Sequence, residues 1–151
     1  MPEYSPLLAP GFTDIDLRDL ERLFVEPFPT PGARRSLVAR FRDLVSLLQE
    51  ISIECDLWLD GSFTTNNPEP GDIDVVIFSD EENLSRLTVS QREKFRRLLS
   101  NKDLTQYRYS CDVSYCERRN AGKRSYWRGW FGFSSDTETP KGIARLHLVP
   151  T

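Results

Sequence analysis

The chain has 151 residues, of which 38% are hydrophobic and 28% are charged, and its formal net charge is −3. This length fits one ordinary domain with a single core, and the composition excludes a disordered chain. The negative charge argues against a protein that coats nucleic acid by bulk electrostatics, although it leaves room for a local basic patch. No apolar run approaches the length of a membrane span.

The cysteine pattern bears on the compartment. Cys55, Cys111 and Cys116 are odd in number and form no Cys-x-x-Cys pair, which fits reduced thiols. The first residues lack the basic and apolar regions of a signal peptide. We therefore expect a cytoplasmic protein.

The first third of the chain predicts an extension followed by helices. Residues 1–32 are punctuated by proline and are expected to pack as an N-terminal extension on a single domain, with a short helix over 14–24. From 34 to 51, apolar residues recur at three- and four-residue spacing, which predicts the clearest amphipathic helix of the chain. These residues are Leu37, Val38, Phe41, Leu44, Val45, Leu48 and Ile51.

The middle of the chain predicts three strands. Apolar patterning predicts strands over 54–60 and 72–79, joined by a loop over 63–71 that is dense in turn formers. A helix is expected over 90–100. Alternating apolar and polar residues then predict a strand over 105–115.

The last part of the chain predicts a basic loop over 116–126 and two further strands, over 127–133 and 143–149. Only one domain, 1–151, is expected. The resulting fold class is α+β, with a mixed, mostly antiparallel sheet of about five strands and helices packed on one face.

One stretch combines the residue types that phosphate chemistry needs. Gly61 and Ser62 follow the first predicted strand, and Asp72 and Asp74 begin the second. Side chains at i and i+2 of a strand share a face, and like charges there repel unless a cation lies between them. The pair therefore suits a divalent cation that carries phosphates. Asp60 precedes the turn, and we expect it to orient the loop or to face solvent.

Together, Gly61-Ser62, the spacer and Asp72-x-Asp74 resemble the signature of the nucleotidyltransferase superfamily, whose fold is the palm of DNA polymerase β. The likeness is greatest to the minimal nucleotidyltransferases of bacterial toxin–antitoxin and defence systems. The resemblance implies a palm fold and two Mg²⁺ ions, for which Mn²⁺ can substitute, held by Asp72, Asp74 and a third acid. Asp112, on the polar face of the predicted strand 105–115, is the candidate for that acid.

Four further residues are nucleotide-binding candidates. Gly61 allows backbone N–H groups to approach a phosphate, and the Ser62 hydroxyl adds a donor. The segment 117–128 holds five basic residues against Glu117, a charge of +5 − 1 = +4. Within it, Arg118 and Lys123 are the candidates for phosphate contact, and a solvated surface loop is the alternative.

The resemblance implies an enzyme that transfers a nucleoside monophosphate, with AMP as the first candidate, from an NTP such as ATP to a hydroxyl of a protein or RNA. A homo-oligomer or a toxin or antitoxin partner is compatible with it. The chain after Asp112 is short for the helical domain of larger polymerases, which disfavours processive synthesis. The alternatives are a catalytically weak nucleotide-binding, antitoxin or regulatory module, and a metal-dependent nuclease.

Overall fold

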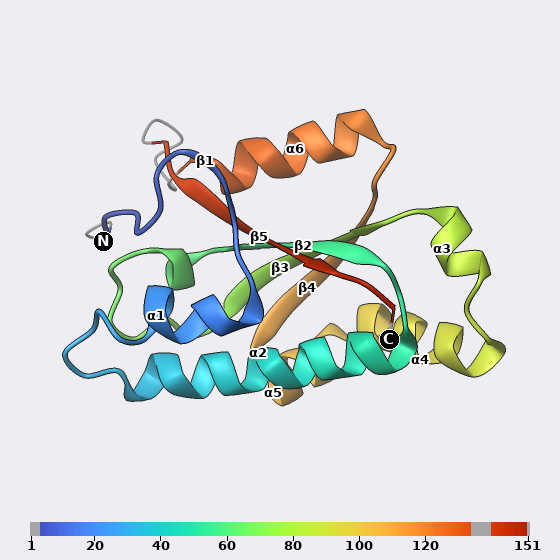
Figure 1. Ribbon diagram of the computed structural model, residues 1–151, viewed down its shortest axis with the longest axis horizontal. Helices are drawn as coiled ribbons and strands as arrows, with labels where there is room; N and C mark the ends of the chain where they lie inside the picture. The colour runs from blue at the N-terminus through green and yellow to red at the C-terminus, as the bar shows by residue number, and fades with distance from the viewer. Residues whose placement is uncertain (1–3, 134–139, 151) are drawn as a thin grey trace.

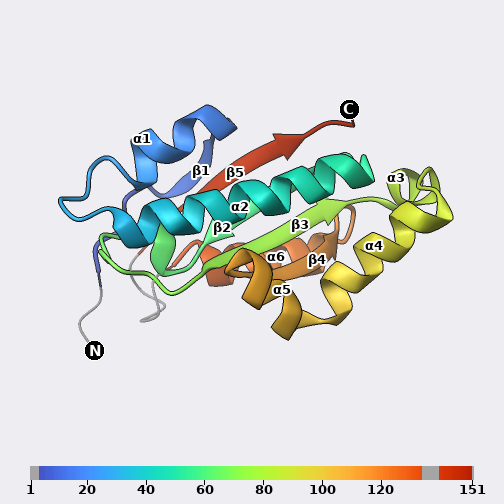
Figure 2. The same ribbon diagram turned by 90° about the horizontal axis from the view of Figure 1, so that it is seen from below.

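The computed structural model describes residues 4–133 and 140–150, in which helices cover both faces of a five-stranded sheet (Figures 1 and 2). The strands are β1 (Gly11–Asp14), β2 (Cys55–Asp60), β3 (Ile73–Ser79), β4 (Cys111–Glu117) and β5 (Gly142–Leu148). The α-helices are α1 (Leu20–Phe24), α2 (Gly32–Ile51), α3 (Glu81–Ser85), α4 (Val89–Ser100), α5 (Lys102–Tyr109) and α6 (Ala121–Phe131). Two 3₁₀ turns, η1 (Leu17–Asp19) and η2 (Ser62–Thr64), complete the described elements.

The sheet has the strand order β1-β5-β2-β3-β4. β2 is antiparallel to both of its neighbours, β3 and β5, whereas β1 pairs with β5 and β3 pairs with β4 in parallel. The prediction of a mostly antiparallel sheet is therefore wrong, because the described pairings divide equally. The cause lies between β3 and β4, where α3, α4 and α5 return the chain to the starting end of the sheet and so allow a parallel pair.

The larger core lies between one face of the sheet and α1, α2 and α4. Alternate residues of the strands, such as Leu57, Val75 and Val113, point into it and meet the apolar stripe of α2. The expected helix over 34–51 is confirmed, since α2 covers it and buries the seven predicted apolar residues. Strands β2, β3 and β5 and helix α4 also lie where the sequence predicts them, within two residues at each end.

The opposite face of the sheet carries a smaller apolar cluster beneath α6. Phe131 of α6 packs there with Trp58, Val76 and Phe78, and Trp127 covers part of it. The expectation that helices pack on one face is therefore wrong. Burial of this aromatic side of α6 against Trp58 is the physical reason for the second layer.

The prediction of one strand over 105–115 is wrong in its first half. The Asn101 side chain accepts a hydrogen bond from the Leu104 N–H and so caps α5, which continues to Tyr109. Ser110 then adopts a left-handed conformation, with φ of 51°, and ends the helix before β4. Asp112 and Val113 still lie on opposite faces of a strand, as expected.

The predicted basic loop over 116–126 and strand over 127–133 are also corrected. The Asn120 side chain accepts from the Lys123 N–H, and α6 runs through both segments. Trp127 and Phe131, one helical turn apart, place their ring centroids 5.6 Å from each other. The fifth strand is instead β1, within the extension, and the helix expected over 14–24 is divided between η1 and α1.

Two further expectations can be compared with the structure. Cys55, Cys111 and Cys116 are free and buried. Over the described ranges, every helix is too short or too polar to cross a membrane.

Candidate functional site

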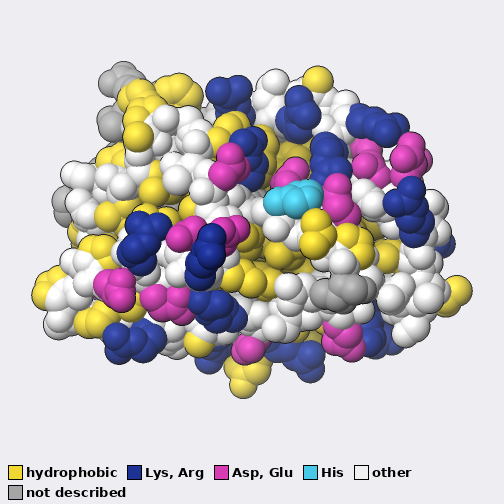
Figure 3. All heavy atoms as spheres, in the orientation of Figure 1, with side chains coloured by type: hydrophobic (Ala, Val, Ile, Leu, Met, Phe, Trp, Pro, Cys, Tyr) yellow, Lys and Arg dark blue, Asp and Glu magenta, His cyan; other side chains and the backbone are white. Residues whose placement is uncertain are grey.

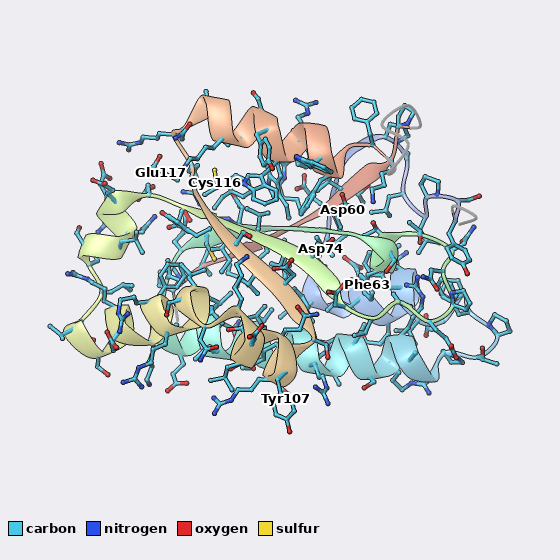
Figure 4. All side chains as sticks on the ribbon, turned by 180° about the vertical axis from the view of Figure 1, so that it is seen from behind. Asp60, Phe63, Asp74, Tyr107, Cys116 and Glu117 are labelled. Atoms are coloured by element: carbon cyan, nitrogen blue, oxygen red, sulfur yellow. The ribbon has the colours of Figure 1, made fainter. Side chains whose placement is uncertain are left out.

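Three aspartates form a row across the sheet, on the face toward α6. Asp60 of β2 is in register with Asp74 of β3, and Asp74 is in register with Asp112 of β4. Side chains directly opposite each other on neighbouring strands have Cβ atoms about 4.5–5.5 Å apart. In Figure 4 the labelled Asp60 and Asp74 lie close together, where β2 and β3 are paired. The fold thus gathers three carboxylates that are far apart in the sequence.

Asp72 joins this row from the residue just before β3. It has the strand parity of Asp74, and its Oδ2 accepts a hydrogen bond from Gln106 Nε2 at 2.8 Å. The half-exposed Asp112 is contacted by Lys102, whose Nζ lies 3.3 Å from Asp112 Oδ1. Helix α5 therefore supplies a polar partner to both Asp72 and Asp112.

The Gly61-Ser62 turn lies directly against Asp74. Gly61 has φ of 86° and ψ of −160°, a conformation that is essentially restricted to glycine. A Cβ atom added to Gly61 would lie 2.6 Å from Asp74 Oδ2. Glycine is therefore needed here both for its backbone conformation and for the space that the Asp74 carboxylate occupies. Ser62 follows as the first residue of η2.

The turn is held from beneath by a buried arginine. Arg34 of α2 has no exposed surface and donates hydrogen bonds to the carbonyl oxygens of Phe63 at 2.7 Å and Asn67 at 2.7 Å, and also to those of Phe24 and Thr65. Because burial disfavours its charge, the pKa of Arg34 falls to about 10. One guanidinium thus fixes the path of the chain after Ser62.

A cavity of about 670 Å³ opens between the row of acids and α6. Asp60, Asp74 and Asp112 line its floor together with Lys141. Its wall is aromatic and consists of Tyr126, Trp127, Trp130, Phe131 and Phe133. Trp130 and Tyr126 keep 61% and 57% of their surface exposed, so flat rings stand free beside carboxylates.

The electrostatics of the row follow from burial and crowding. Burial, and after it the charges of Asp72 and Asp112, together raise the pKa of Asp74 to about 6. Burial also raises the pKa of Asp60, an effect that Lys141 partly offsets from 2.7 Å. The Asp60 and Lys141 side chains are only 1% and 9% exposed, so they form a buried ion pair at the inner end of the cavity.

The two basic residues expected at the phosphates do not line this cavity. Arg118 follows β4 at the other end of the strand from Asp112, where it donates hydrogen bonds to Glu54 and Asp80. Lys123 is exposed in the first turn of α6. The structure brings Lys102 and Lys141 to the acids instead.

Hard, oxygen-rich ligand sets are what Mg²⁺ prefers, and Asp72, Asp74 and Asp112 supply such a set on one face. After burial, the charges of Asp72 and Asp112 are the main causes of the raised pKa of Asp74, so negative charge is crowded around this carboxyl group. As the side chains lie, no group of three or more His, Cys, Asp or Glu among residues 4–133 and 140–150 is arranged to hold a metal ion. The donors fit Mg²⁺ in kind, and Asp72 and Asp112 would have to turn away from Gln106 and Lys102.

Some residues of the site were missed from the sequence. Asp60 was expected to orient the loop or to face solvent. It does hold the turn, because it accepts a hydrogen bond from Thr64 Oγ1 at 2.9 Å, but it is buried and in register with Asp74. The sequence indicates that Asp60 shares a strand face with Trp58, but it does not indicate the antiparallel register that places Asp60 opposite Asp74. Lys141 follows the segment 134–139, which lies outside the described residues, and no motif in the sequence identifies it.

Comparison with known proteins adds the family but no activity. Neither a protein of curated function nor a solved structure matches the chain. A family model described as a family of unknown function, DUF6932, matches residues 2–147. Because this match spans nearly the whole sequence, the chain belongs to the DUF6932 family.

Proposed function

We propose that this protein is a Mg²⁺-dependent nucleotidyltransferase with a palm-type sheet. It would transfer a nucleoside monophosphate, with AMP as the first candidate, from an NTP to a hydroxyl of a protein or RNA. The observation that carries the proposal is the register pair of Asp74 and Asp112, with Asp72 on the same face and Gly61 packed against the Asp74 carboxylate.

Each group of the site has a role in this proposal. Bound Mg²⁺ would neutralise the triphosphate and lower the pKa of the attacking hydroxyl. Asp72, Asp74 and Asp112 would hold the metal, and the half-exposed Asp112 would also accept a hydrogen bond from the acceptor hydroxyl and so orient it. Trp130 and Tyr126 offer faces on which a base stacks. The side chain of Lys102 is long and exposed, so its ammonium group can leave the Asp112 carboxylate and contact a phosphate oxygen instead.

The proposal is tested by label transfer. The purified protein is incubated with each α-labelled NTP, Mg²⁺ or Mn²⁺ and cell lysate, and labelled products are identified by mass spectrometry. Asp74→Asn and Asp112→Asn should abolish transfer, whereas Asp103→Asn, an exposed acid of α5, should leave it unchanged. Absence of Asp74-dependent transfer with any NTP would refute the proposal, and RNA cleavage without NTP would assign the acids to a nuclease.

A second candidate is a nucleotide-binding module without turnover, in a regulatory or antitoxin role. The contacts of Lys102 with Asp112 and of Gln106 with Asp72 favour this second function, because both carboxylates already have partners within the protein. Calorimetry separates the two functions. ATP binding that survives Asp112→Asn, without label transfer, would support the module.

A further inference from the structure

A second cavity, of about 290 Å³, lies on the same face of the sheet but on the other side of α6. Four arginines line it, against the single carboxylate of Asp56. They are Arg118, Arg124, Arg128 and Arg145. In Figure 3, Lys and Arg side chains gather along the upper part of the molecule, where Figure 1 shows α6.

Two of these arginines are already neutralised. Arg145 Nε lies 2.7 Å from Asp14 Oδ1. Arg118 is ion-paired with Glu54 and Asp80. These pairs fix the two guanidinium groups against the strands and form a rigid side of the cavity.

The other two arginines come from α6, one helical turn apart, and are exposed. Arg124 Nη1 donates to the carbonyl oxygen of Arg118 at 3.1 Å, and the Arg128 guanidinium lies 5.6 Å from the centroid of the Phe12 ring. In the part of the chain that the structure describes, neither has a carboxylate within ion-pair distance. Their positive charge is therefore held at the cavity by neutral partners.

A phosphate is the ligand class that this arrangement suits. A guanidinium presents paired N–H donors that match two phosphate oxygens. Two guanidinium groups on one turn, without a carboxylate partner among residues 4–133 and 140–150, match the charge of a phosphate. The floor of the cavity is formed by Trp58 and Phe78, which are 7% and 1% exposed. Such a floor keeps water from one side of a bound phosphate, where the charge interaction is less screened.

We propose that this cavity binds a phosphate group. Helix α6 lies between this cavity and the carboxylate cavity, and one bound molecule that crosses α6 reaches both. Ser125 lines both cavities, and Tyr126 and Arg124 flank it. The phosphate would belong to the acceptor, either a phosphodiester of single-stranded RNA or the phosphate of a free nucleotide. The assignment to the acceptor rests on the proposed transfer function, whereas phosphate binding itself does not.

The test measures binding to the full-length protein without NTP. A short fluorescent single-stranded RNA is titrated by anisotropy at several salt concentrations, with AMP, inorganic phosphate and a poly-glutamate peptide as competitors. Arg124→Gln/Arg128→Gln removes the two uncompensated charges, and Arg124→Lys/Arg128→Lys keeps them without the paired donors. Arg92→Gln/Arg108→Gln, which changes exposed arginines of α4 and α5, is the charge-matched control.

The glutamine variant should weaken RNA binding by about tenfold or more. It should also reduce the slope of log affinity against log salt by roughly 1.4, since each lost contact on a single strand contributes about 0.7. The lysine variant should keep most of the salt slope and lose part of the affinity. RNA binding that neither AMP nor inorganic phosphate displaces identifies a polymer, and competition by AMP or inorganic phosphate identifies a single phosphate group.

Three outcomes would overturn the phosphate site. They are equal binding by the glutamine variant and its control, stronger competition by poly-glutamate than by any phosphate compound, and no binding of RNA, AMP or inorganic phosphate. Asp74→Asn separates the two proposals, because it should bind RNA normally and fail in transfer. Transfer without phosphate binding would remove this cavity and leave the proposed function intact.

Discussion

The carboxylate of Asp74 occupies the space that a side chain on Gly61 would fill, with Oδ2 2.6 Å from the position of such a Cβ atom. The turn that follows β2 and the first acid of β3 are therefore one packed unit. The spacing of these two residues in the sequence carries the resemblance to nucleotidyltransferases, and their contact is the physical reason for a glycine at this position.

Gly61→Ala should damage both the fold and the site. The backbone conformation at Gly61 costs about 1–3 kcal/mol for any other residue, and the new methyl group would also push the Asp74 carboxylate out of the row. We expect a loss of that size in the free energy of unfolding by urea denaturation, and loss of the proposed nucleotidyl transfer. Gly71→Ala is the control, because nothing lies within 4 Å of its Cβ position. Equal effects of the two substitutions would contradict the packing argument.

The raised pKa of Asp74 predicts a pH dependence of stability. Between pH about 4, where the carboxyl titrates in the unfolded chain, and about 6, where it titrates in the folded one, the native state binds more protons. The contribution of Asp74 to the free energy of unfolding therefore falls as the pH rises through this window and stays low above it. Asp74→Asn should remove this dependence.

The measurement for Asp74 is the difference in unfolding free energy between the wild type and Asp74→Asn from pH 4 to 8. We expect the difference to favour the wild type most at the acid end and to level off above pH about 6. Asp43→Asn, an exposed acid on α2, serves as the control. A flat difference curve would show that Asp74 is not held in a crowded, buried setting.

The spacing of apolar residues was sufficient to predict the elements that follow a regular apolar pattern. The three- and four-residue spacing of α2 and the apolar runs of β2 and β3 are each confirmed within two residues. Strand parity also put Asp112 on the face opposite Val113, even though half of the predicted strand is α5. Local pattern thus predicted side-chain direction better than it predicted element type.

The remaining features depend on information that local pattern does not carry. The aromatic residues of 127–133 favour a strand by propensity, but the spacing of Trp127 and Phe131 also matches one helical turn. Packing of this aromatic pair beside Trp58 stabilises the helix instead. The register of Asp60 with Asp74 is set by the whole sheet, since the long loop between β2 and β3 fixes no register. The contact of Lys141 with Asp60 depends on a second register, that of β5 with β2, because Lys141 directly precedes β5.

Arg34 should be needed for the order of the turn as well as for stability. Lysine keeps the charge but cannot donate to all five carbonyl groups that Arg34 reaches, so Arg34→Lys leaves buried acceptors unpaired. We expect a loss of at least about 2 kcal/mol in unfolding free energy. Faster hydrogen exchange should appear at the Thr64 and Thr65 amides, which close η2.

The matched control for Arg34 is its exposed neighbour in α2, through Arg35→Lys, which should change neither quantity. Exchange at Thr64 and Thr65 that matches the wild type, in an Arg34→Lys protein of reduced stability, would assign Arg34 to the core alone. Protection lost at these two amides, with α4 amides unchanged, would assign it to the turn.

The buried pair of Lys141 and Asp60 makes the last prediction. Lys141→Met would leave the Asp60 carboxylate with Thr64 Oγ1, at 2.9 Å, as its remaining side-chain donor in the described residues. Removing one partner of a buried ion pair costs about 3–5 kcal/mol, which corresponds to a fall in Tm of roughly 6–20 °C for a domain of this size. Without Lys141 the pKa of Asp60 rises further, so the loss of stability grows as the pH rises above the usual pKa of a carboxyl group. Thermal unfolding at pH 8 measures it.

A double variant separates charge burial from packing at this pair. Lys141→Met with Asp60→Asn removes both charges, so it should recover much of the Tm lost by Lys141→Met alone. Lys94→Met breaks an exposed pair with Glu50 and should cost less than about 1 kcal/mol. If the double variant were no more stable than Lys141→Met, the loss would come from the lysine stem packed beside the cavity rather than from the unpaired carboxylate of Asp60.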